Sequence, residues 1–161
     1  GKAHREYLAD LLNGFCSQTY LSVKKESIDF KTQYSTIPDS FLNLGPYGGI
    51  LSAFKKDPNS AWLVVATDLP LLDASTLNDL IKGRDKSKIA TCFHNPETAF
   101  PEPLLTLWEP RAYSILLQFL AYGYSCPRKV LINSDIKELR IKNTDALHNV
   151  NTPEELKVIK E

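Results

Sequence analysis

Asp68 is the residue best placed for chemistry, because it follows an apolar run. Residues 61–66 read Ala-Trp-Leu-Val-Val-Ala, and Thr67-Asp68-Leu69-Pro70 comes next. A continuous apolar run without alternation is typical of a strand buried on both faces, as at the centre of a mostly parallel sheet. Ligands of open α/β sheets bind outside the carboxyl ends of the strands, so Asp68 is predicted to lie at the ligand edge. Its carboxylate suits Mg²⁺, which usually takes one or two protein carboxylates plus substrate phosphates. The alternative is that Asp68 only caps a turn before Pro70.

A second candidate is the segment Gly45-Pro46-Tyr47-Gly48-Gly49, which we expect to be a loop ahead of a helix over 50–54. Glycines let the backbone approach a ligand closely, and the N-terminus of a helix favours anions. The segment matches neither the dinucleotide-binding glycine fingerprint nor a phosphate-binding loop with its lysine. The alternative is a tight turn into the helix.

Two asparagines form a third candidate, in Asn149-Val150-Asn151-Thr152-Pro153. In an extended segment, side chains at i and i+2 point to the same face. Amides both donate and accept hydrogen bonds, which suits the edge of a heterocycle or sugar. The alternative is that Asn151 merely precedes the cap of a C-terminal helix that begins at Thr152.

Other residue types that could do chemistry form no recognisable site. The histidines lack the spacing of metal ligands, and the cysteines include no Cys-x-x-Cys pair, so unpaired thiols in a reducing cytoplasm are predicted. These residues are His4, His94, His148, Cys16, Cys92 and Cys126.

Strands and helices alternate along the 161 residues, which predicts one α/β domain with helices on both faces of a mostly parallel sheet. Hydrophobic periodicity and stop signals place the elements. Helices are expected over 4–13, 50–54, 75–82, 110–122, 127–134 and from 152, and strands over 19–23, 33–37, 61–66, 88–93, 104–108 and 138–142.

Charge and hydropathy narrow the class of partner. Nineteen basic residues balance nineteen acidic ones, which argues against a basic nucleic-acid footprint. No apolar stretch approaches the ~18 residues of a membrane helix, and residues 1–6 lack the apolar core of a signal peptide. A cytoplasmic protein acting on small molecules is predicted.

Three segments, in chain order, resemble molybdenum cofactor guanylyltransferases. Gly45–Leu51 is similar to their Gly-Pro-Leu-Ala-Gly stretch, Leu63–Pro70 to their strand ending in Cys-Asp-Met-Pro, and Asn149–Leu156 to their closing Asn-x-Asn-Thr-Pro-Glu-Asp/Glu-Leu. The resemblance implies a Rossmann-like three-layer fold of the nucleotide-diphospho-sugar transferase type. It also implies transfer of GMP from GTP to molybdopterin with release of pyrophosphate.

The resemblance further implies roles for single residues. Asp68 would be the catalytic residue and would bind Mg²⁺ (or Mn²⁺) and the nucleotide phosphates. Asn149 and Asn151 would face the pterin or its metal, and molybdoenzymes or other cofactor-biosynthesis proteins would be partners. The residues implied to line the GTP pocket are Asp39, Gly45, Pro46, Gly48 and Gly49.

Two departures from the family pattern leave alternatives open. The usual opening, Leu-Ala-Gly-Gly-x-Ser-x-Arg-Met-Gly-x-Asp-Lys, does not occur, as if about 30 residues, one βα unit, preceded Gly1 in the family. Because that strand is central, we expect its absence to expose apolar sheet surface, weaken GTP binding and favour self-association. Lys24 stands where the family pattern leads us to expect an asparagine that contacts the nucleotide base. The alternatives are a relative that uses CTP or another phosphate acceptor, and a nucleotide- or pterin-binding protein without turnover.

Overall fold

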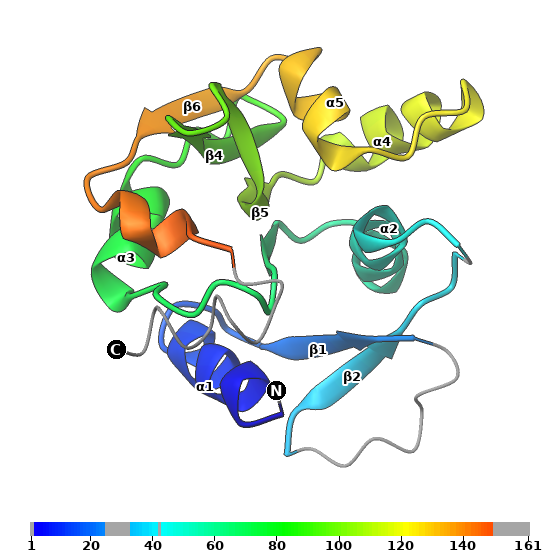
Figure 1. Ribbon diagram of the computed structural model, residues 1–161. Coiled ribbons are helices and arrows are strands. Elements are labelled where there is room, and N and C mark those ends of the chain that lie inside the picture. Colours follow the sequence, from blue (N-terminus) through cyan, green and yellow to red (C-terminus); the bar gives the residue numbers. More distant parts are fainter. Residues whose placement is uncertain (1, 25–32, 42, 150–161) are drawn as a thin grey trace.

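The computed structural model describes residues 2–24, 33–41 and 43–149 (Figure 1). Asn151 and the expected C-terminal helix from Thr152 lie outside these residues. The helices are α1 (Lys2–Asn13), α2 (Pro46–Lys56), α3 (Ala74–Lys82), α4 (Ala112–Ala121), α5 (Pro127–Ile132) and the 3-10 helix η2 (Thr144–Leu147). The strands are β1 (Tyr20–Val23), β2 (Ser35–Pro38), β3 (Trp62–Val65), β4 (Ala90–Asn95), β5 (Phe100–Trp108) and β6 (Lys137–Arg140).

The described strands form two sheets rather than one. β1 and β2 pair in parallel, and the second sheet has the order β3-β5-β4-β6. In the second sheet β5 runs antiparallel to both β3 and β4, and only β4 and β6 are parallel. The α/β class is therefore confirmed, but the described strands do not form the mostly parallel sheet expected from the sequence.

The β4–β5 connection explains the mixed sheet. Only residues 96–99 separate the two strands, with Ala99 in the left-handed region (φ 63°) and its N–H donating to Asn95 O at 2.8 Å. A parallel pair needs a crossover of a dozen or more residues, whereas a short turn joins antiparallel neighbours. The sequence prediction of a longer loop between strands ending at 93 and beginning at 104 was wrong, because both strands continue to this turn.

Two cores lie on opposite faces of the sheets. Trp62 and Val64 pack against the first core, which contains buried residues of α2, α4 and α5. Leu63 and Val65 pack against the second, which contains Leu8 of α1 and residues of α3 and η2. The side chains of β3 therefore alternate between the two cores. Helices cover both faces, as expected from the sequence.

β3 itself differs from its sequence prediction. The apolar run predicts a central strand, yet β3 is the edge strand of its sheet and all four of its residues are only half-buried. Its second edge faces a cleft between the two sheets.

A buried ion pair ties the end of α3 to the end of β5. Arg84 Nε and Nη2 donate to the two carboxylate oxygens of Glu109 at 2.7 Å each, and the Glu109 side chain is 3% exposed. The hydrogen bonding to Glu109 raises the pKa of Arg84 above its ordinary value. A bidentate pair of this kind satisfies a carboxylate that is otherwise costly to bury.

We predict that Arg84→Met lowers the free energy of unfolding by about 3 kcal/mol, because Glu109 loses its charged partner in a buried position. Arg84→Met combined with Glu109→Leu removes both charges and should recover most of the loss. Urea unfolding of the three proteins measures this, and equal losses in the single and double variants would show that the pair is not the cause.

Candidate functional site

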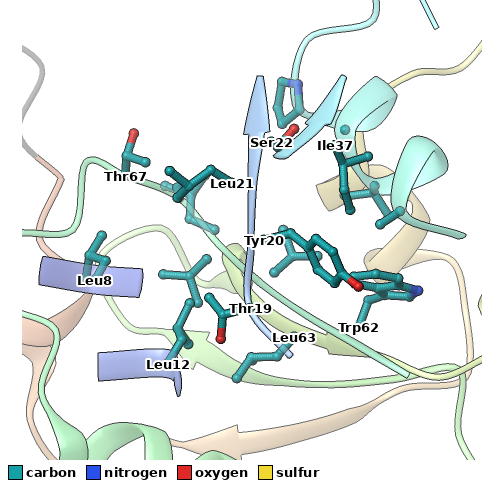
Figure 2. A pocket seen from close by; sticks show the side chains of 18 of the residues that line it. Leu8, Leu12, Thr19, Tyr20, Leu21, Ser22, Ile37, Trp62, Leu63 and Thr67 are labelled. Carbon is teal, nitrogen blue, oxygen red and sulfur yellow. The ribbon is translucent and has the colours of Figure 1, made fainter. Parts of the chain in front are cut away.

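The cleft between the two sheets has a volume of ≈ 1520 Å³. Its polar end lies where strands finish, since Lys24 follows β1, Asp39 follows β2 and Asp68 follows β3, and all three line it. The remainder is largely apolar, with Leu8 and Leu12 on one side of β1 and Trp62 on the other (Figure 2). The structure therefore places the predicted carboxylates at the carboxyl ends of strands, where α/β sheets bind ligands.

Asp68 and Asn149 are in direct contact at this polar end. With the amide oriented so that nitrogen rather than oxygen faces the carboxylate, Asn149 Nδ2 donates to Asp68 Oδ2 at 2.7 Å and to Oδ1 and the main-chain O at 3.1 Å each. The opposite orientation would set amide oxygen against carboxylate oxygen, which is repulsive. The amide therefore fixes the Asp68 side chain, so two residues that are 81 positions apart in the chain share one site.

Asp39 is held by hydrogen bonds from residues just ahead of α2 and within it. Its Oδ1 accepts from Phe41 N at 2.9 Å, and Ser52 Oγ lies 3.3 Å from the same oxygen. The Ser52 hydroxyl donates to Gly48 O at 2.7 Å and accepts from Ser40 N at 2.9 Å. A carboxylate beside the N-terminal turn of a helix is electrostatically favourable, so Asp39 stabilises α2 as well as lining the cleft.

The glycine segment is mostly helix rather than loop, which corrects the sequence prediction. α2 begins at Pro46, a residue suited to the first turn, and only Gly45 keeps a loop conformation with φ 58°. Gly45, Pro46 and Gly49 line the cleft, whereas Gly48 does not. A Cβ at Gly48 would lie 2.7 Å from Phe41 O and 2.8 Å from Asp39 Oδ1. Gly48 therefore serves the packing of α2 against Asp39.

Tyr47, between these glycines, points away from the cleft. It is fully buried in the core, and its hydroxyl donates to Leu116 O in α4. Burial raises the pKa of Tyr47 to about 12. The side chain therefore stays neutral and anchors α2 to α4.

Several cleft residues carry no signal in the sequence. Arg128 of α5 lines the cleft, and its Nε is buried without a hydrogen-bond partner among the described residues. Asn43 also lines it, with φ 61°. Neither belongs to a recognisable motif, and only the fold brings α5 to the cleft.

Metal-binding groups are sparse in the part of the chain that is described. No group of three or more His, Cys, Asp or Glu side chains is close enough there to hold an ion. The three cysteines are unpaired, as expected. No described helix has both the length and the apolar character to cross a membrane.

Two solved structures share this fold. The crystal structure of molybdopterin-guanine dinucleotide biosynthesis protein A from Archaeoglobus fulgidus matches with a TM-score of 0.73 at 21% identity, over 92% of this chain and 81% of that one. A protein of Aquifex aeolicus matches with a TM-score of 0.78 at 17% identity, over 94% and 81%. Both matches show that this α/β fold is shared with these structures.

The chain belongs to the MobA-like NTP transferase domain family, whose sequence profile matches residues 1–137. It is 30% identical over 157 residues to a molybdenum cofactor biosynthesis bifunctional protein of Synechocystis, covering 96% of this chain but 45% of that protein. It is 23% identical over 153 residues to a probable molybdenum cofactor guanylyltransferase of Flavobacterium johnsoniae, over 94% of this chain and 79% of that protein. The chain thus spans less than half of the bifunctional relative.

We predict that Gly48→Ala destabilises the protein by about 1–3 kcal/mol, because the added methyl group meets main-chain oxygen and a carboxylate at under 3 Å. Gly14→Ala is the matched control, since its Cβ would meet only Leu11 O at 3.5 Å. Thermal unfolding compares the two, and a loss in both or in neither would contradict the packing role of Gly48.

Proposed function

We propose that the protein is a molybdenum cofactor guanylyltransferase, which transfers GMP from GTP to molybdopterin and releases pyrophosphate. The observation that carries the proposal is the Asp68–Asn149 pair at the carboxyl end of β3, in a chain of the NTP transferase family. The names of the two relatives support a role in molybdenum cofactor biosynthesis.

In the proposed reaction a phosphate oxygen of molybdopterin attacks the α-phosphorus of GTP. The new P–O bond forms as the bond from the α-phosphorus to the bridging oxygen breaks, and pyrophosphate leaves with that electron pair. Negative charge builds on the phosphate oxygens, so fixed donors and cations at the polar end of the cleft would stabilise the transition state.

The residues present fit a divalent cation at Asp68. A carboxylate offers about four lone-pair sites, so the contacts from Asn149 leave room for a cation, and Mg²⁺ commonly uses one or two protein carboxylates. When bound, Mg²⁺ (or Mn²⁺) would neutralise phosphate charge. Asp68 would hold it, and Asn149 would keep the carboxylate in one orientation.

The other predicted residues would act on the nucleotide itself. Gly45 and Gly49 present backbone without side-chain bulk to the cleft, and Asp39 lines the same cleft. Asn149 sits against Asp68 rather than apart from it, so we propose that Asn149 serves the catalytic carboxylate. The pterin contact first expected for the asparagine pair is then proposed for Asn151 alone.

Lys24 supports a second candidate, a nucleotidyltransferase that uses CTP or another phosphate acceptor. It is exposed at the end of β1, where the family resemblance leads us to expect an asparagine for the base. A lysine can donate to guanine O6 and N7, but equally to acceptors on cytosine. Calorimetry of the full-length polypeptide with GTP, CTP, ATP and UTP, each with Mg²⁺, tests the choice, and tightest binding of CTP would overturn the guanine proposal.

We predict that Asp68→Asn keeps the fold but lowers turnover by on the order of 10²–10³, the scale for one lost electrostatic stabiliser. Asp135→Asn is the control, because Asp135 forms an exposed ion pair with Lys88 outside the cleft. Retention of wild-type turnover by Asp68→Asn at limiting Mg²⁺ would remove Asp68 from the site.

We predict that Asn149→Ala weakens Mn²⁺–GTP binding by about 10-fold or more, because the Asp68 carboxylate loses its orienting donor. The neighbouring exposed residue gives a control, His148→Ala. Electron paramagnetic resonance of Mn²⁺ measures binding without requiring turnover. Unchanged Mn²⁺ binding together with weakened pterin binding would return Asn149 to the acceptor side.

A further inference from the structure

The connection from β2 to α2 carries an asparagine whose side chain is not engaged in the fold. Asn43 is exposed, lines the cleft and has φ 61°. Its amide forms no hydrogen bond within the part of the chain that the structure describes. The amide of Asn149, by contrast, is occupied by Asp68. Asn43 therefore offers the cleft a donor and an acceptor that no described group uses.

The chain is held on both sides of Asn43. On the side of β2, Phe41 N donates to Asp39 Oδ1 at 2.9 Å, and Phe41 O lies 2.7 Å from where a Cβ on Gly48 would be. On the side of α2, Gly48 N donates to Gly45 O at 3.1 Å. Asn43 therefore lies in the chain between two fixed residues, Asp39 and Gly45, that line the cleft with it.

Lys24 and Asp39 follow two paired strands at neighbouring positions. The parallel ladder pairs Val23 with Pro38, and Asp39 N donates to Val23 O at 2.9 Å. Lys24 and Asp39 come directly after these two residues, and both line the cleft. An ammonium group, a carboxylate and the amide of Asn43 thus gather where β1 and β2 end.

The three side chains differ in what they can recognise on a nucleobase. Lys24 only donates, so it serves acceptors on guanine and cytosine alike. The ionised Asp39 only accepts, and its Oδ1 is already used by Phe41 N and Ser52 Oγ. No described residue uses Oδ2, which keeps two lone-pair sites for a ligand. Guanine alone among the four bases presents two neighbouring donor groups, N1–H and N2–H₂, beside one acceptor, O6.

We infer that Asn43 Nδ2 donates to O6 of the guanine base while Asp39 Oδ2 accepts from its N1–H and N2–H₂, which makes Asn43 a specificity-determining residue. The inference rests on the proposed function, because it names how that site selects its nucleotide. The backbone of Asn43 fits this role, since asparagine adopts the left-handed conformation more readily than most residues and adds an amide that glycine lacks.

The test replaces Asn43 with glycine, which accepts the same φ and removes only the side chain. Asn59→Gly is the matched control, because Asn59 is exposed and does not line the cleft. Calorimetry of the full-length polypeptide measures the binding of GTP, 6-thio-GTP, ATP and CTP, each with Mg²⁺. Sulfur is a weak hydrogen-bond acceptor, so 6-thio-GTP changes only the atom that Asn43 is inferred to contact.

The wild-type protein and Asn59→Gly are expected to bind GTP on the order of tenfold more tightly than 6-thio-GTP, the scale of one hydrogen bond. Asn43→Gly is expected to bind the two about equally, because the contact to position 6 is gone. Equal binding of GTP and 6-thio-GTP by the wild-type protein, or an undiminished preference in Asn43→Gly, overturns the inference alone. Tightest binding of CTP by the wild-type protein overturns the proposed function, and the contact to guanine O6 falls with it.

Discussion

The packing of α2 between the two sheets is the constraint on which the rest of the structure depends. Tyr47, Leu51 and Phe54 are fully buried in the core that α2 shares with β3 and α4. On the other side, Gly48 and Gly49 let α2 approach Asp39 and Ser22 closely. One helix therefore contacts both sheets and keeps their strand ends at a common edge (Figure 1).

That constraint explains how separate residues come to share one chemical environment. Asp39 accepts hydrogen bonds from Phe41 N, just ahead of α2, and from Ser52 within α2. Asp68 follows β3, which packs on the same helix. Asn149 then reaches Asp68 from the far end of the described chain. A carboxylate fixed in this way presents its oxygens without a large entropic cost on binding, which is the value of a preorganised site.

The sequence was sufficient for the α/β class, most of the elements and the position of Asp68 at a strand end, because these depend on local hydrophobic patterns. It was insufficient to predict that β5 runs antiparallel to β4. The short turn between them uses Ala99 in the left-handed region, and alanine gives no turn signal in a sequence. Gly48 was expected in a loop but lies in the first turn of α2, because a glycine needed for close packing looks the same in sequence as one in a loop. The Asp68–Asn149 contact also could not be predicted, because nothing local connects residues so distant in sequence.

The central claim is that the nucleotide binds at the polar end of the cleft, between Asp68 and the start of α2. The most direct test is a titration of the ¹⁵N-labelled protein with Mg²⁺ and GTP, followed by amide chemical shifts. We expect the largest changes at Thr67, Asp68, Asn149, Gly45 and Gly49, with little change at β6. Shifts that cluster on β6 and spare Asp68 and Gly45 would contradict the account.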